Sequence, residues 1–94
     1  MHHEDFLIPA GHPALAGHFP GNPVVPGVVV LDAIADALER GHDRCITGFR
    51  QVKFVAPLLP EQPAALELDV TDERLRFRVL RGDDLIASGE ATTA

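Results

Sequence analysis

The sequence predicts an α+β domain in which one helix packs against an antiparallel β-sheet. Residues 28–38 read VVVLDAIADAL and are apolar nearly all the way round, which is typical of a helix enclosed by other structure. Residues 64–93 form three segments separated by short turns, and alternation in the first two indicates an antiparallel meander with one polar face. The 94 residues have room for one domain, 1–94, so the helix and the sheet must bury their apolar faces against each other.

The helix is predicted over residues 25–40. Pro26 suits the first turn of a helix, because the N–H that proline lacks would have no intrahelical partner there. Gly27 permits close approach of another backbone or of a ligand. Gly41 is a natural residue to follow the helix, and Arg40 is favourable at its negative end.

Strands are predicted on both sides of this helix. A short strand covers residues 5–9 and precedes a loop rich in glycine and proline, and a long one covers 46–56. After the proline-rich bend at 57–63, residues 64–70 alternate. Leu75, Phe77 and Val79 then alternate with arginines, and the last strand covers 85–93. Turns are expected at 71–73 and 82–84.

Composition excludes several classes of protein. The single cysteine, Cys45, rules out an intrachain disulfide and is expected to be a small apolar filler. A net charge of -6 argues against nucleic acid as a main partner. The sequence shows neither a signal peptide nor a membrane-spanning run, so we expect a cytoplasmic protein without a membrane partner. A chain this short, with 46% hydrophobic but only 5% aromatic residues, must build an aliphatic core, which also favours self-association.

The basic residues all lie in the later part of the chain. Arg74, Arg76 and Arg78 follow one another at alternate positions, which is most often a solvated sheet face. A second interpretation is a docking patch for an acidic partner, shared with other basic residues. Those residues are Arg40, Arg44, Arg50 and Lys53.

Residues 17–32, GHFPGNPVVPGVVVLD, join a loop with one histidine to a helix with one aspartate. His18 would suit a general base, since an unperturbed imidazole has a pKa of about 6.5. Asp32 in an apolar helix is costly unless it is protonated or paired, and a raised pKa would suit a general acid. The simpler alternatives are that His18 is a turn residue and that Asp32 serves the helix dipole.

The segment GHFPGNPVVPGVVVLDAIA resembles the signature of the 3-hydroxyacyl-(acyl-carrier-protein) dehydratases, the FabA/FabZ-like enzymes of the hotdog fold, and VKFVAPLLP resembles the strand after their helix. The resemblance covers most of the chain from about Phe6. It implies a curved antiparallel sheet wrapped around one central helix, here in a short version. The acid is Asp32, as in the 3-hydroxydecanoyl dehydratase/isomerase branch, whereas the more widespread branch carries Glu.

By this resemblance, His18 and Asp32 are the catalytic base and acid, contributed by different subunits of a homodimer or larger oligomer. The backbone N–H of Gly27 or Val28 would bind the thioester oxygen at the positive end of the helix. An acyl tunnel would run along the helix. Its expected lining residues are Phe19, Val24, Val28, Val29 and Phe54.

Two further residues are weaker candidates. Asp36 lies one turn after Asp32 on roughly the same face and either supports the catalytic acid or is a plain subunit contact. His12 could line the tunnel mouth, although a loop role fits better. His2 and His3 lie too near a free end to make a credible metal site, and we expect neither a metal nor an organic cofactor.

These observations predict a hydro-lyase that converts 3-hydroxyacyl thioesters, carried on acyl carrier protein or CoA, to trans-2-enoyl thioesters in fatty-acid, polyketide or polyene-type synthesis. Two alternatives stay open. One is a hotdog acyl thioesterase in which Asp32 activates water. The other is a catalytically silent hotdog module that binds acyl chains or a partner enzyme.

Overall fold

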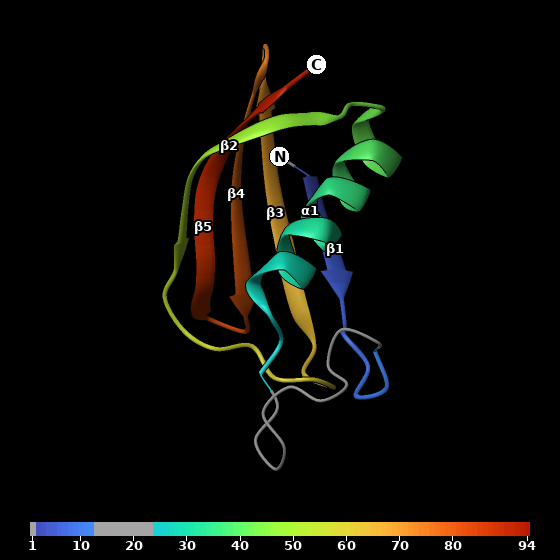
Figure 1. The fold of residues 1–94 in the computed structure, drawn as a ribbon, viewed down its shortest axis with the longest axis vertical. Helices are drawn as coiled ribbons and strands as arrows, with labels where there is room; N and C mark the ends of the chain where they lie inside the picture. The colour runs from blue at the N-terminus through green and yellow to red at the C-terminus, as the bar shows by residue number, and fades with distance from the viewer. Residues whose placement is uncertain (1, 13–23) are drawn as a thin grey trace.

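The computed structural model describes residues 2–12 and 24–94, which form one helix and a five-stranded antiparallel sheet (Figure 1). The elements are β1 (His2–Phe6), α1 (Gly27–His42), β2 (Ile46–Phe54), β3 (Ala64–Thr71), β4 (Arg74–Arg81) and β5 (Asp84–Thr93). Their order in the sheet is β1-β3-β4-β5-β2, so β1 and β2 are the edge strands. The predicted α+β architecture is confirmed.

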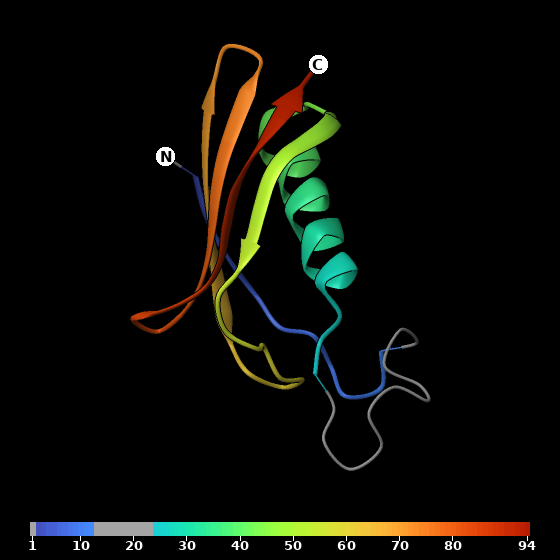
Figure 2. The ribbon, with the colours of Figure 1, turned by 60° about the vertical axis from the view of Figure 1, so that its left-hand side comes forward.

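The helix lies along one face of the sheet (Figure 2). Its buried stripe contains Val29, Val30, Ile34, Ala37 and Leu38, at the spacing of one helical face. Facing it are alternate residues of β3 and β4, which the register sets side by side: Leu66 opposite Val79 and Leu68 opposite Phe77. The strands that come nearest to α1 are the two edges, β1 and β2, as expected for a sheet that curls around the helix.

A glycine in β5 lies where β2 comes unusually close to it. A Cβ built on Gly89 would lie 2.1 Å from the carbonyl oxygen of Gln51 and 2.7 Å from Cζ of Phe77. The β2–β5 register shifts nearby, between Phe49 and Gln51, as at a β-bulge, and a bulge bends a strand. Phe49 packs edge-to-face on Phe77 with ring centroids 6.1 Å apart. Gly89 therefore lets β2 approach β5 closely where the sheet bends.

The helix boundaries differ from the prediction. The helix extends to His42 and ends at Asp43, which has left-handed dihedral angles (φ 53°, ψ 42°) and donates its N–H to the carbonyl of Glu39. Gly41, predicted to follow the helix, is its last residue but one. A Cβ there would lie 2.9 Å from Cε1 of His2, so this glycine serves close packing against β1.

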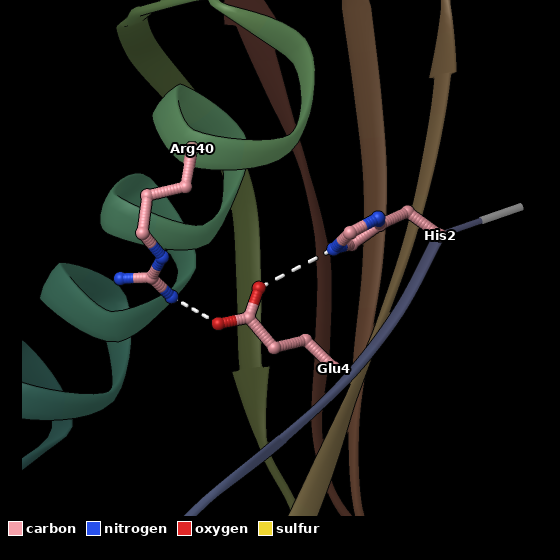
Figure 3. Close-up of polar contacts among 3 residues, drawn as sticks. All are labelled: His2, Glu4 and Arg40. Carbon is pink, nitrogen blue, oxygen red and sulfur yellow. Dashed lines mark hydrogen bonds and ion pairs between the residues drawn. The ribbon is translucent and has the colours of Figure 1, made fainter.

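The first strand also differs from the prediction, because it covers residues 2–6 instead of 5–9. Figure 3 shows how its inner side chains meet the last turns of α1: the Glu4 carboxylate accepts hydrogen bonds from Arg40 and from His2, the latter at 3.3 Å. Burial acts to raise the pKa of Glu4, but the hydrogen bonds from His2 and Arg40 outweigh it and lower that pKa below its usual value of 4.5. Arg40 therefore joins β1 to the helix.

Arg74, Arg76 and Arg78 of β4 lie on the outer face of the sheet, as the simpler interpretation predicted. Two of them form ion pairs there: Arg76 with Glu90 and Arg78 with Glu67, each at 3.2 Å. These acids neutralise much of the row, which weakens the alternative of a basic docking patch. Cys45 is exposed, so the prediction that it fills a gap in the core is wrong.

Candidate functional site

The start of the helix presents backbone N–H groups that have no partner within the helix itself. Pro26 is the N-cap residue, no side chain of the described part of the chain caps the helix, and its first turn carries no acid. Val29 donates its N–H to the Pro26 carbonyl at 3.0 Å. The N–H groups of Gly27 and Val28 come before it, at the end of the helix where the dipole is positive. They can therefore bind an anionic or strongly polarised oxygen.

An apolar groove of about 470 Å³ lies beside this helix start. Two of the predicted tunnel residues, Val24 and Phe54, line it together with Gly27. The other lining residues are Val25, Pro26, Val30, Val55, Ala56, Pro57, Leu58 and Ile86. The groove thus brings apolar walls and the open end of the helix together, which suits a ligand with an apolar tail and a polar head.

The remaining tunnel candidates lie elsewhere. Val29 is in the core with 5% of its surface exposed and does not line the groove. Val28 is 65% exposed on the outer face of the helix. His18 and Phe19 lie outside the described residues.

Asp32 and Asp36 are both exposed on the same side of the helix as Val28. Within the described residues neither carboxylate forms a hydrogen bond or an ion pair. The prediction that other structure encloses the helix, and buries Asp32, is therefore wrong for a single protomer. Val28, Asp32 and Asp36 follow one another at intervals of four residues, so they form one continuous uncovered stripe.

The loop after β2 holds both described flanks of the segment that contains His18. The Glu61 N–H donates to the Ile8 carbonyl at 2.8 Å, and the Glu61 carboxylate accepts from the N–H of Ala10 at 2.8 Å. On the other side, Val25 donates its N–H to the Leu58 carbonyl at 2.8 Å. Glu61 has a positive φ of 62°. The sequence did not indicate this role, because only a turn was evident in the proline-rich bend.

His12 lies in the turn that follows this first flank. Its N–H donates to the Pro9 carbonyl at 3.0 Å, so the backbone of His12 closes a turn. This position agrees with the loop role that was preferred for His12 from the sequence.

A second, larger hollow of about 1060 Å³ lies at the other end of the helix. Its walls are mostly charged: they include Asp43, Asp69 and Glu73 as well as Arg74 and Arg76. Such a lining does not suit an acyl chain. Among residues 2–12 and 24–94 there is no group of three or more His, Cys, Asp or Glu side chains placed to hold a metal ion. In the same part of the chain, no helix is both long and apolar enough to cross a membrane.

A sequence profile described as ApeI-like, for the ApeI dehydratase, matches residues 2–90. The chain belongs to this dehydratase family. The 3-hydroxyacyl-(acyl-carrier-protein) dehydratase FabZ of Haemophilus influenzae (strain PittEE) is 34% identical over 85 residues, which cover 80% of this chain and 57% of that protein. The chain thus spans little more than half the length of the curated relatives it matches.

Solved structures show the same fold. One chain of the dehydratase heterocomplex ApeI:P from Xenorhabdus doucetiae superposes with a TM-score of 0.84 at 22% identity, covering 100% of this chain and 95% of that one. The fluoroacetyl-CoA-specific thioesterase FlK superposes with a TM-score of 0.66 at 19% identity, covering 100% and 88%. The prediction of a hotdog fold is confirmed. Since a dehydratase and a thioesterase share this fold, the fold alone does not separate their activities.

Three residues named from the resemblance lie together at the groove beside the helix start. Gly27, Val24 and Phe54 were predicted from the resemblance, and the structure places all three at one groove. The loop residues Pro57 and Leu58, which were not predicted to line a tunnel, form another wall of it. A hint was available in the sequence: a bend with three prolines within seven residues restricts the backbone strongly.

Proposed function

We propose that this chain dehydrates 3-hydroxyacyl thioesters to trans-2-enoyl thioesters. The observation that carries the proposal is the apolar groove lined by Gly27, the first residue of the helix, in a member of a dehydratase family. The N–H groups of Gly27 and of Val28 next to it lie at the positive end of the helix. The groove suits the acyl chain, and the two N–H groups suit a thioester oxygen that gains negative charge.

The elimination requires one base and one acid. In this proposal His18 removes the α-proton, and the electron pair left behind forms the double bond between the α- and β-carbons. The bond between the β-carbon and the hydroxyl oxygen breaks, and Asp32 in its protonated form supplies the proton with which that oxygen leaves as water. The proton on His18 then returns to Asp32 through solvent. No electrons are transferred to or from the substrate overall, so side chains suffice for the chemistry.

A second protomer completes the site in this proposal. The stripe of Val28, Asp32 and Asp36 is uncovered in one protomer, and Phe54 and Val55 nearby are 49% and 56% exposed. The edge strand β2 lies beside them with one side of its backbone unpaired within the sheet. A homodimer would cover this surface and bury Asp32, and such burial favours the protonated acid. His18 of one protomer would then face Asp32 of its mate, and a larger oligomer of such dimers is compatible with this arrangement.

The thioester carrier is acyl carrier protein or CoA. The name of the Haemophilus influenzae relative supports acyl carrier protein. The similar fold from Xenorhabdus doucetiae belongs to a dehydratase heterocomplex, which supports assembly of this chain with a second one. A cytoplasmic location belongs to the same proposal, since the substrates of such an enzyme are carried by soluble carriers.

The direct test is to incubate the purified protein with a 3-hydroxyacyl thioester on acyl carrier protein and on CoA, and to identify the product by mass spectrometry. Loss of one water with the thioester intact supports the proposal. Release of the free 3-hydroxy acid would instead show a thioesterase. An unchanged substrate that still binds would show a silent acyl-binding module.

A further inference from the structure

One wall of the apolar groove is formed by a proline-rich loop that lacks the regular hydrogen bonds of a β-strand. Ala56, Pro57 and Leu58 line the groove, and the loop continues through Pro60 and Pro63. Proline has no N–H, so ladder hydrogen bonds cannot fix this stretch. The last contacts to β5 before it are those of Val55 and Ala56, whose N–H groups donate to the Ile86 carbonyl at 2.8 and 3.3 Å. From Pro57 onward the loop must be held by other groups.

Arg81, at the end of β4, supplies those contacts. Its Nη1 donates to the carbonyl oxygen of Pro57 at 3.1 Å and to Oε1 of Gln62 at 3.0 Å. The same Oε1 accepts the N–H of Leu59 at 3.2 Å, which closes the loop on itself. The other terminal nitrogen of Arg81 lies 3.7 Å from a carboxylate oxygen of Asp84, across the β4–β5 turn. The side chain is only 30% exposed, so its position is well constrained.

Leu58 links the loop that Arg81 holds to the start of the helix. Leu58, next to Pro57, is 3% exposed, and its carbonyl accepts the N–H of Val25 just before the helix. Leu58 is thus held in the core by a hydrogen bond of its own, so loss of the Arg81 contact should displace Pro57 and the groove wall more than the beginning of α1.

We propose that Arg81 is a positioning residue that sets the width of the groove by holding Pro57, and thereby selects which acyl tails fit. The inference rests on the proposed function in one respect, namely that the groove takes the acyl tail of the thioester. Arg81 itself reaches the backbone of the wall and contacts no reacting atom. It should therefore act on the discrimination between tails and leave the chemical step alone.

The test compares Arg81→Met, which keeps an unbranched side chain but removes the guanidinium and all its donors, with Arg81→Lys, which keeps a charged group that can donate. Arg76→Met is the matched control, since Arg76 lies on the same strand with an ion pair to Glu90 and does not line the groove. For each protein, kcat and KM are measured with 3-hydroxyacyl thioesters of short, long and branched tails. A pocket that fits its tail discriminates about 10-fold or more per misplaced methyl group.

We expect Arg81→Met to reduce the ratio of kcat/KM between the preferred and the branched tail by about 10-fold, through KM, with kcat for the preferred tail within about 3-fold of the wild type. Arg81→Lys should restore part of the ratio, and Arg76→Met should leave it unchanged. An unchanged ratio in Arg81→Met, or an equal change in Arg76→Met, overturns the inference.

A second variant and a second assay cover the cases in which Arg81→Met does not fold or the wild type is inactive. If Arg81→Met does not fold, Gln62→Leu replaces it, because this change removes the acceptor shared by Arg81 and Leu59. If the wild type yields no enoyl product, the proposed function fails, and the inference is judged by calorimetric binding of saturated linear and branched fatty acids. Equal selectivity of the wild type and the Arg81 variants in that assay then overturns it, and weaker selectivity in the variants supports it.

Discussion

The ring of Phe54 rests on Gly27, the first residue of the helix: a Cβ at position 27 would lie 2.8 Å from Cζ of Phe54. No residue larger than glycine fits there unless the ring moves. The ring is at the end of a side chain that is half exposed, so it has room to move. The contact therefore determines the shape of the groove more than it determines the stability of the fold.

Gly27→Ala should displace Phe54 and narrow the groove at the open end of the helix. We expect kcat/KM for dehydration to fall by about 10-fold or more, because small displacements of a bound substrate are costly to the rate. The melting temperature should change little. Gly11→Ala is the control, since a Cβ at Gly11 meets nothing within 4 Å. Full activity of Gly27→Ala would contradict a role for this groove in catalysis.

Asp32→Asn should lower kcat by about 10²–10⁴-fold, the usual contribution of a general acid, and His18→Ala should lower it by a similar factor. Asp36→Asn is a matched control on the same exposed stripe of the helix. We expect it to keep most of the activity, as befits a subunit contact. Equal losses in Asp32→Asn and Asp36→Asn would show that the two carboxylates act as a pair. Circular dichroism checks that each variant is folded.

Mixing the two inactive variants tests whether the site is shared between protomers. In a two-fold dimer, a hybrid of His18→Ala and Asp32→Asn subunits has one site with both changes and one site with neither. Random exchange of subunits at equal concentrations should therefore restore about a quarter of the wild-type activity. Each variant mixed with itself serves as the control. No recovery, with subunit exchange verified by mass spectrometry, would place the base and the acid in the same chain.

Several elements were predictable because their signal is local. The alternation of Leu75, Phe77 and Val79 with arginines gave β4 and its buried face directly, and the apolar run from Val28 gave the helix. The end of the helix was not predictable in this way. Gly41 has the residue type of a helix terminator, yet it is glycine because the ring of His2, 39 positions earlier, packs against it.

Some residues of the candidate site could likewise be predicted from the sequence, and others could not. Gly27, Val24 and Phe54 could be named because each belongs to one of the two segments that resemble the family, 17–35 and 52–60. The anchoring of this region by Glu61 could not, since its partners Ile8 and Ala10 lie more than 50 positions away and three of the four groups involved belong to the backbone. Exposure of Asp32 was also unpredictable, because a sequence does not distinguish burial within a protomer from burial between two.

The contact between Glu4 and Arg40 should make stability depend on pH. The pKa of Glu4 is lowered in the folded state, so its carboxylate contributes stability above the unfolded value of about 4.5 and loses this contribution as the pH falls through the folded value. Glu4→Gln should therefore unfold more easily than the wild type at pH 7, by about 0.5 kcal/mol for a pair so near the surface. The difference should shrink below pH ~4.5, where the wild-type carboxylate becomes protonated.

Urea unfolding at a series of pH values measures this difference. Asp5→Asn is the control, because Asp5 is exposed on the same strand and, within the described residues, forms no ion pair. A gap between Glu4→Gln and the wild type that stays constant from pH 7 to below pH ~4 would mean that the carboxylate charge is not what joins β1 to α1.

Gly89→Ala should be among the most damaging single changes in the sheet. Its Cβ would lie 2.1 Å from the Gln51 carbonyl oxygen, which belongs to the backbone of β2 and has no rotamer by which to withdraw, and 2.7 Å from the buried ring of Phe77. Either β2 separates from β5 or the core repacks. We expect a loss of about 3 kcal/mol in the free energy of unfolding, at the upper end of what overpacking costs in a core, because one of the clashing atoms belongs to the backbone.

Gly48→Ala, on β2 near the same bend, is the control: its Cβ would make an ordinary contact of 3.5 Å with Oγ1 of Thr92. Urea unfolding compares the two variants with the wild type. If Gly89→Ala is as stable as Gly48→Ala, the close approach of β2 to β5 does not set the curvature of the sheet.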